Sequence, residues 1–457
     1  MFQSKKIILI DPPDMVPDPD KGKHLQQATE MQEVYPPLGL AYIAAVLRKN
    51  GIDVEIIDAR SCGLTYEKVV GVVKEENVVF VGIYVNTSKI KNSLYLSKRI
   101  KEIKPNIMII LGGPHINFEH EEIINNQAVD FCVRGEGEFT ALELINTACS
   151  NGDLRGVRGI TYKREGHVIV NPDRPFVKDL DAISFPARGL LPNPVYGGAW
   201  TQGKKFSSML ATRGCPYLCQ FCDAPAIWGR NHRRRSVENV LDELEEICRK
   251  FEVRYVRFID DLLVASRDWG IKLCRGIVER GLDKVLVWSC DGRVGIMTEE
   301  LLKEMKNANC QIIFYGIEFG NQRILDLCKK GFRISQIRET IDMTTRAGIS
   351  SYGYFMMGYP TETVQTIEDT IALAKDLALN HGMDGAGFSI VTPFPGTGLY
   401  QYCKENNLLK ITDWSQYSYQ LGRGVIRLKD VTDEELSDLY HKAIYEFQFK
   451  EQLHQFV

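Results

Sequence analysis

The sequence of 457 residues lacks the features that mark several large classes of protein. It contains no apolar run of roughly 18 residues, which a membrane-spanning helix needs. Its formal net charge is -3, so it lacks the positive excess of a nucleic-acid-binding protein. Its first residues lack the apolar core and cleavage site of a signal peptide. We therefore expect a cytoplasmic protein with no membrane span and no nucleic-acid partner.

Cysteine, in contrast, is plentiful, with 12 residues in the chain. In a reducing compartment, cysteines act as buried thiols or metal ligands rather than disulfides. Most are scattered, but Cys215, Cys219 and Cys222 form the pattern C-x-x-x-C-x-x-C. Cubane iron–sulfur clusters usually take a cysteine at every iron. Three local cysteines therefore predict a cubane with one iron left open to a substrate or cofactor.

Two simpler interpretations of this triplet exist. A structural zinc site needs a fourth ligand, for which His232 is the nearest downstream candidate, but the spacing is not that of common zinc pairs. Buried core thiols are the other interpretation, but chance rarely places three cysteines so close together. We therefore favour the iron–sulfur interpretation.

Residues 1–150 alternate short apolar runs with amphipathic stretches. This alternation predicts a parallel, doubly wound, Rossmann-like α/β sheet that binds ligands at the carboxyl ends of its strands. Strands are expected over 6–10, 54–57, 78–85, 107–111 and 131–133, and helices over 38–50, 91–103 and 138–149.

The rest of the chain has three predicted parts. Residues 151–200 contain a hairpin signal around 164–166 and then five prolines, which indicate an extended linker. Residues 201–400 alternate strands with helices as in a partial (β/α)6 barrel, whose active site lies at the carboxyl ends of the strands. Residues 401–457 form a helical extension with a helix over 433–448. The barrel strands are expected over 208–211, 255–259, 285–289, 312–317, 351–357 and 387–391.

The run Thr-Arg-Gly-Cys-Pro-Tyr-Leu-Cys-Gln-Phe-Cys-Asp resembles the signature of the radical SAM enzymes, including Phe221, the aromatic residue before the third cysteine. The resemblance implies that a 4Fe-4S cluster on the three cysteines binds S-adenosylmethionine (SAM) and cleaves it to a 5′-deoxyadenosyl radical. In such enzymes the cofactor supplies the difficult chemistry and the protein positions it.

The same resemblance suggests residues that contact SAM. Glu318, which ends the fourth barrel strand and precedes Phe319-Gly320, matches the ribose-binding position, with the glycine allowing close approach. The acidic pair Asp260 and Asp261 ends the second strand, where family members bind the methionine amine, although the common Gly-Gly-Glu is missing. A solvated acid is the alternative at each of these positions.

Two further SAM contacts are suggested on later strands. Arg293 follows the third strand and is placed to meet a carboxylate, with a surface ion pair as the alternative. Gly358 closes a segment that resembles the family's adenine-binding glycine motif, although it is equally an ordinary turn. The basic run at Arg230 and 233–235 suits an anionic substrate or an electron donor, but a solvated face before a helix capped by Ser236 is the simpler interpretation.

Glycine-rich and polar segments follow the strands of the first part. Together, ahead of a radical SAM barrel, they resemble the cobalamin-binding domain of the cobalamin-dependent radical SAM family. The resemblance covers roughly residues 1–400. No histidine lies in the Asp-x-His-x-x-Gly context that supplies a lower cobalt ligand, so we expect cobalamin to bind without one. The expected cobalamin-binding residues are Pro37, Leu38, Gly39, Thr87, Ser88, Gly112, Gly113, His115, Gly135, Glu136, Gly137 and Glu138.

The resemblance implies methylation of an unactivated carbon of a small-molecule or natural-product substrate, with flavodoxin or ferredoxin as the reductant. A cobalamin-dependent radical cyclase or rearrangement enzyme is the alternative, since Ile227-Trp228-Gly229-Arg230 resembles the anaerobic magnesium-protoporphyrin monomethyl ester cyclases. A corrinoid-binding module with a structural cluster is a third possibility.

Overall fold

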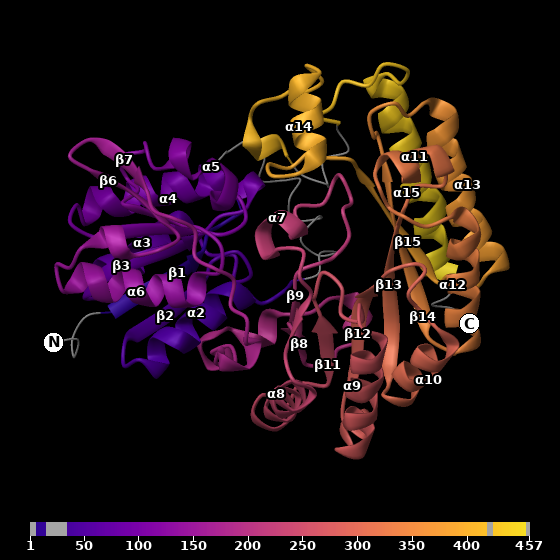
Figure 1. Ribbon diagram of the computed structural model, residues 1–457, viewed down its shortest axis with the longest axis horizontal. Coiled ribbons are helices and arrows are strands. Elements are labelled where there is room, and N and C mark those ends of the chain that lie inside the picture. The colour runs from indigo at the N-terminus through magenta and orange to yellow at the C-terminus, as the bar shows by residue number, and fades with distance from the viewer. Residues whose placement is uncertain (1–5, 15–33, 418–423, 454–457) are drawn as a thin grey trace. The chain divides into compact units, whose positions relative to one another are not determined.

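The computed structural model of the protein describes residues 6–14, 34–417 and 424–453. It divides into two α/β units, residues 1–208 and 209–457, which can be followed by colour in Figure 1. Each unit is built on its own sheet. No helix in the described ranges is long and apolar enough to cross a membrane.

The first unit contains a seven-stranded sheet in the order β2-β1-β3-β4-β5-β6-β7. Strands β1 to β5 are parallel, which confirms the doubly wound class. The chain order reverses between β1 and β3, and ligands of such sheets bind at this topological switch point. The strands are β1 (Lys6–Asp11), β2 (Asp53–Asp58), β3 (Val78–Tyr84), β4 (Met108–Gly112), β5 (Phe131–Val133), β6 (Ile160–Arg164) and β7 (His167–Val170).

The parallel strands form because their apolar runs are buried, as in Ile7–Ile10 of β1. Helices α2, α4 and α6 occupy the predicted positions, while α3 and α5 were not predicted. Helix α5 contains a non-helical residue, Glu119, which weakens its periodic signal. The helices are α2 (Leu38–Lys49), α3 (Tyr66–Glu75), α4 (Ile90–Ile103), α5 (Ile116–Ile123) and α6 (Gly137–Cys149).

The segment predicted as a linker differs from expectation. Its hairpin, β6 and β7, pairs antiparallel with β5 and so continues the first sheet. The proline-rich part is also anchored to the first sheet, because the Tyr196 hydroxyl donates a hydrogen bond to Asp58 at the end of β2. Residues 151–200 therefore belong to the first unit, because their polar groups are satisfied there.

The second unit contains six strands in the order β15-β14-β13-β12-β11-β8. Sequential neighbours pair in parallel from β11 to β15, as the predicted partial barrel requires. Alternate strand residues such as Val256, Cys290 and Ile313 join one large apolar core. The strands are β8 (Phe206–Met209), β11 (Tyr255–Phe258), β12 (Val287–Gly292), β13 (Cys310–Glu318), β14 (Ser350–Met357) and β15 (Gly385–Ile390).

Helices alternate with these strands and continue into the predicted C-terminal extension. In that extension, Leu436 and Tyr440 of α15 pack with Ile367 and Ile390, so the last helix completes the second unit. The helices are α7 (Ala224–Trp228), α8 (Val237–Lys250), α9 (Arg267–Glu279), α10 (Glu299–Asn307), α11 (Gln322–Leu327), α12 (Ile334–Arg346), α13 (Val364–Asn380), α14 (Gly398–Glu405) and α15 (Asp433–Leu453).

Gly320 provides a test of packing in the second unit. A Cβ atom there would lie 2.4 Å from the Asp369 carbonyl oxygen in α13. The glycine therefore lets the loop approach α13, rather than a ligand as its sequence context suggested. We expect Gly320→Ala to lower the free energy of unfolding by about 1–3 kcal/mol. We expect Gly71→Ala, where no atom lies within 4 Å of the added carbon, to raise it by up to about 1 kcal/mol. Urea denaturation measures both, and equal effects would contradict the packing explanation.

Candidate functional site

The three cysteines lie on residues 214–232, here called the cysteine loop. Short antiparallel strands at its two ends, β9 (Thr212–Arg213) and β10 (Arg233–Arg234), hold these ends together just after β8. Gly214 has φ 92°, and a Cβ there would lie 2.5 Å from the Asn231 carbonyl oxygen. The loop therefore closes only with glycine before the first cysteine.

The middle of the cysteine loop is fixed by backbone hydrogen bonds. The Gln220 N–H donates to the Cys328 carbonyl at 2.9 Å, and the Leu399 N–H donates to the Gln220 carbonyl at 2.8 Å. These bonds connect the loop to the end of α11 and the start of α14. The cysteines thus stand on a braced segment at the carboxyl edge of the sheet.

The donor set of the loop fits a cluster with three protein ligands. Within the described ranges, no group of three or more His, Cys, Asp or Glu side chains is placed so that it could hold a metal ion. His232 Nε2 lies 2.7 Å from the Leu262 carbonyl oxygen, and its Nδ1 is buried without a hydrogen-bond partner, so this contact leaves the zinc alternative open. The thiols are partly accessible and none forms a disulfide.

Burial makes two of the metal-free cysteines, Cys215 and Cys222, poor thiolates. It raises the pKa of Cys215, and it raises the pKa of Cys222 to about 12, with the Asp223 and Cys219 charges adding to the effect. Cluster ligands must be deprotonated. A bound metal ion favours the thiolate form of its cysteine ligands, and nearby positive charge adds to that stabilisation.

Arg293, which follows β12, supplies such a charge. Its Nη1 lies 3.9 Å from Cys219 Sγ, its guanidinium carbon lies 3.5 Å from the centre of the Tyr217 ring, and it donates to the Lys330 carbonyl. The side chain is buried and forms no ion pair with any carboxylate of the described chain. The surface ion-pair alternative for Arg293 is therefore wrong, and its contact with a SAM carboxylate stays a prediction.

Glu318 ends β13 in an unusual backbone conformation, with φ 71°. The pairing of β13 with β14 shifts register between Gly316 and Glu318, and such a bulge re-aims a side chain. The Glu318 carboxylate meets the buried Lys330 ammonium at 2.8 Å. Gly316 leaves room for this pair, because a Cβ there would lie 2.6 Å from Glu318 Oε1. The predicted ribose-binding acid is thus held by a lysine.

The two predicted acids after β11 have different environments. Asp260 is buried and accepts hydrogen bonds from the Ala211 N–H at 2.9 Å and from the Thr212 hydroxyl at 2.6 Å. Burial raises its pKa to about 7. Asp261 is exposed to solvent, yet desolvation by its surroundings and then the Asp223 and Asp291 charges raise its pKa to about 6. Asp260 therefore braces the backbone, and Asp261 is the acid open to a ligand.

Gly358 lies after β14 with φ 89°. The carboxylate of buried Glu362 accepts from the Gly358 N–H at 2.7 Å and from the Tyr359 N–H at 2.8 Å. This contact fixes the shape of the predicted adenine-binding turn. Phe221, the remaining predicted SAM residue, has the Lys330 ammonium 5.5 Å from its ring centre.

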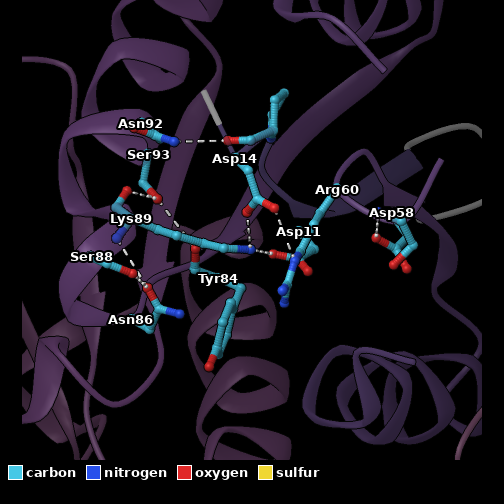
Figure 2. Close-up of polar contacts among 12 residues, drawn as sticks. Asp11, Asp14, Asp58, Arg60, Tyr84, Asn86, Ser88, Lys89, Asn92 and Ser93 are labelled. Carbon is cyan, nitrogen blue, oxygen red and sulfur yellow. Dashed lines mark hydrogen bonds and ion pairs between the residues drawn. The ribbon is translucent and has the colours of Figure 1, made fainter. Parts of the chain in front are cut away.

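A second charged site lies at the carboxyl edge of the first sheet (Figure 2). Asp11 ends β1, and Lys89 ends the short 3-10 helix Thr87–Lys89 after β3. The Lys89 ammonium lies 2.9 Å from Asp11 and 3.3 Å from Asp14, which also meets Arg60 at 3.1 Å. The Lys89 and Asp11 side chains are 7% and 9% exposed. This buried pair therefore spans the topological switch point.

The predicted cobalamin residues next to this pair are connected to one another. The Thr87 hydroxyl lies 3.2 Å from His115 Nδ1, and the Ser88 hydroxyl donates to Asn86 at 3.1 Å. His115 is 1% exposed, and burial lowers its pKa to about 4, so it is neutral at pH 7. Gly113 must be glycine, since a Cβ would lie 2.5 Å from the Val85 carbonyl oxygen.

The other predicted cobalamin-binding residues lie at the same edge of the sheet, some fixed by hydrogen bonds and others facing open space. The Gly135 N–H donates to Asn117 at 2.7 Å, and Glu136 accepts from the Val177 N–H at 2.5 Å. No atom lies within 4 Å of a Cβ added at Gly39. Cobalamin contacts remain predictions for the whole set, which also includes Pro37 and Leu38 at the start of α2, Gly112 at the end of β4, and Gly137 and buried Glu138 at the start of α6.

The basic run after the cysteine loop is only partly a solvated face. Ser236 caps α8 as predicted, accepting from the Asn239 N–H at 3.1 Å. Arg235, however, is buried and forms an ion pair with buried Glu243. The interpretation as a solvated surface is therefore wrong for Arg235.

Sequence reasoning missed Lys89, Lys330 and Glu362. Lys330 lies in Cys-Lys-Lys-Gly, where nothing distinguishes it from its neighbour, and only the fold brings it to Glu318. Glu362 could have been predicted from the sequence, since a carboxylate four residues after a turn glycine can accept a hydrogen bond from the N–H of that glycine.

Comparisons with known proteins agree with this arrangement. Residues 28–145 match the B12 binding domain, and residues 209–374 match the radical SAM superfamily. An uncharacterized methyltransferase of Pyrococcus horikoshii is 34% identical over 90% of this chain and 87% of its own length. An anaerobic magnesium-protoporphyrin IX monomethyl ester cyclase of Rubrivivax gelatinosus is 29% identical over 84% of this chain and 69% of its own.

Among solved structures, the radical SAM methyltransferase TsrM of Kitasatospora setae, with cobalamin and a [4Fe-4S] cluster bound, has a TM-score of 0.71. It is 17% identical, and the alignment covers 88% of this chain and 78% of that one. At this identity the likeness concerns the fold.

The raised pKa of Asp260 predicts a pH-dependent stability. Between its ordinary value of 3.8 and about 7, the unfolded chain has released this proton while the folded chain retains it. Rising pH therefore destabilises the fold across this window. We expect Asp260→Asn to gain stability relative to the parent, on the order of 1–4 kcal/mol, between pH 4 and pH 8. Asp268→Asn, at a side chain 84% exposed, is the control. If the difference in free energy of unfolding between D260N and the parent were the same at every pH, this prediction would be wrong.

The buried Lys89–Asp11 pair predicts an asymmetric mutational response. Lys89→Met leaves a buried carboxylate without its partner, which costs about 3–5 kcal/mol in comparable pairs. We expect the double variant Lys89→Met/Asp11→Leu to recover much of that loss, and Lys98→Met on the exposed face of α4 to cost little. Urea denaturation gives the values, and a double variant as unstable as K89M would contradict the ion-pair account.

Proposed function

Since the chain belongs to the radical SAM enzymes that carry a cobalamin-binding domain, we propose that it methylates an unactivated carbon of a small-molecule substrate. The observation that carries this proposal is the presence, in one chain, of the three-cysteine loop and a B12-binding domain. Its resemblance to an uncharacterized methyltransferase over most of both chains supports the same reaction.

The proposal assigns roles to residues of both sheets. Cys215, Cys219 and Cys222 would hold a 4Fe-4S cluster, next to which SAM would bind. When bound, the cluster supplies the electron that cleaves SAM, and cobalamin supplies the methyl group that is transferred. Glu318 binds the ribose hydroxyls.

Other side chains complete the proposed SAM site. Asp261 accepts from the methionine amine, and Asp260 keeps the backbone next to it in place. Arg293 pairs with negative charge at the cluster or on the methionine carboxylate. The turn at Gly358, shaped by Glu362, presents backbone groups to adenine. Positioning of this kind raises the effective concentration of the reacting groups and limits access of water.

In the first unit, the carboxyl edge around Thr87, Gly113 and Gly135 holds cobalamin. His115 is buried and bonded to Thr87, which supports binding without a histidine below cobalt. Flavodoxin or ferredoxin is the proposed reductant. We place the enzyme in the cytoplasm, because its free cysteines fit a reducing compartment.

A cobalamin-dependent cyclase is the second candidate. It is favoured by the likeness to the Rubrivivax gelatinosus cyclase, over 84% of this chain. The products distinguish the two, because a methyltransferase releases S-adenosylhomocysteine as well as 5′-deoxyadenosine and a cyclase does not.

The test is a product assay on anaerobically reconstituted protein with cobalamin, SAM and dithionite. We expect about four irons per chain, as for a cubane, and formation of 5′-deoxyadenosine. We expect Cys219→Ala to abolish that product. Cys62→Ala, at an exposed cysteine of the first unit, is the matched control and keeps wild-type yield. Wild-type cleavage of SAM by C219A would refute the proposed ligand set.

A further inference from the structure

We propose that Arg293 and Lys330 form a cationic support for the Cys219 corner of the cluster and make the cluster easier to reduce. The inference rests on the proposed ligation by Cys215, Cys219 and Cys222. It concerns the electron-transfer step, which precedes any choice between methylation and cyclisation.

The position of Arg293 is the first argument. A buried guanidinium is normally paired with an acid, because an uncompensated buried charge is costly. Arg293 is 7% exposed and has no carboxylate partner in the described chain. Its Nη1 lies instead 3.9 Å from Cys219 Sγ. A thiolate at Cys219 is therefore the anion that this guanidinium faces.

Lys330 is the second argument, because it connects both functional groups. Its backbone carbonyl accepts a hydrogen bond from Arg293, and its ammonium pairs with Glu318 at 2.8 Å. The ammonium also lies 5.5 Å from the ring centre of Phe221 and 5.8 Å from that of Phe332. Arg293, Lys330 and Glu318 together leave one net positive charge beside Cys219.

This arrangement has a defined effect on reduction. The cluster accepts one electron from the low-potential reductant, so its charge becomes more negative by one, and no bond forms or breaks in this step. Net charge and hydrogen bonds to the sulfurs are known determinants of cluster potential. In a desolvated site, positive charge favours the reduced state. Removal of positive charge must lower the midpoint potential, and removal of negative charge must raise it.

The chain allows a test in which the variants shift the potential in opposite directions. Arg293→Gln removes a positive charge but keeps hydrogen-bond donors. Glu318→Gln removes a negative charge. The double variant Lys330→Met/Glu318→Gln removes one charge of each sign and restores the net charge. A purely structural role predicts damage that accumulates in the double variant, whereas the electrostatic role predicts a return toward the wild-type potential.

The measurement is a redox titration followed by electron paramagnetic resonance on anaerobically reconstituted protein without SAM. At the wild-type midpoint, we expect about a tenfold lower ratio of reduced to oxidised cluster in R293Q, equal to a shift of about 59 mV for a one-electron couple. We expect E318Q to shift by a similar amount in the opposite direction, and the double variant to lie near wild type.

Two arginine variants serve as controls. Arg293→Lys keeps the charge and should stay near the wild-type midpoint. Arg346→Gln should also have no effect. Arg346 ends α12 before β14 begins, at the sheet edge opposite the cysteine loop, and forms an ion pair with exposed Glu299. Iron content establishes that each variant carries its cluster. If R293Q does not assemble a cluster, the midpoints of E318Q and of the double variant test the proposal instead.

An unchanged midpoint in R293Q at wild-type iron content overturns the cationic support, as does a shift of E318Q in the same direction as R293Q. These results leave the proposed function standing. If the proposed ligation by Cys219 were wrong, the result would be different: C219A would keep the wild-type iron content and the wild-type cluster signal.

Discussion

A buried lysine–carboxylate pair stands at the carboxyl edge of each parallel sheet, and the functional surfaces are built around these pairs. Lys89 meets Asp11 in the first unit, and Lys330 meets Glu318 in the second. Parallel strands end at a common edge, and helices desolvate the polar residues there. An acid at such a strand end therefore needs a buried cation, or it must take up a proton.

In the second unit, the lysine that pairs with the strand-end acid also contacts the arginine beside the cysteine loop. Lys330 neutralises Glu318 and holds Arg293 through its carbonyl, so the guanidinium of Arg293 is directed at Cys219. Burial raises the pKa of Cys215 and that of Cys222 in the metal-free loop. Arg293 adds positive charge beside Cys219, where the cluster is proposed to bind.

Glycines in the loops after strands and at the start of α2 contribute in two different ways. Gly113, Gly214 and Gly320 lie so close to neighbouring backbone that any side chain would collide with it. Gly39 and Gly135 face open space. The first group shapes the scaffold, and the second leaves access to backbone groups at the edge where cobalamin is proposed to bind.

The sequence by itself determined the class of both sheets, the order of the barrel strands and the identity of the three cysteines. These features depend on local patterns, namely periodic apolar residues and the spacing of thiols in one loop. The family models agree with the two domain classes, and the role of the three cysteines as cluster ligands stays a prediction.

Only the tertiary structure decided which charges meet. Lys330 lies twelve residues after Glu318, Lys89 lies 78 residues after Asp11, and Arg293 lies 74 residues after Cys219. It also decided that the hairpin at 160–170 completes the first sheet, because strand pairing is a non-local contact. Periodicity and motif spacing are properties of neighbouring residues, whereas desolvation and charge pairing exist only after distant strands have been brought to one edge.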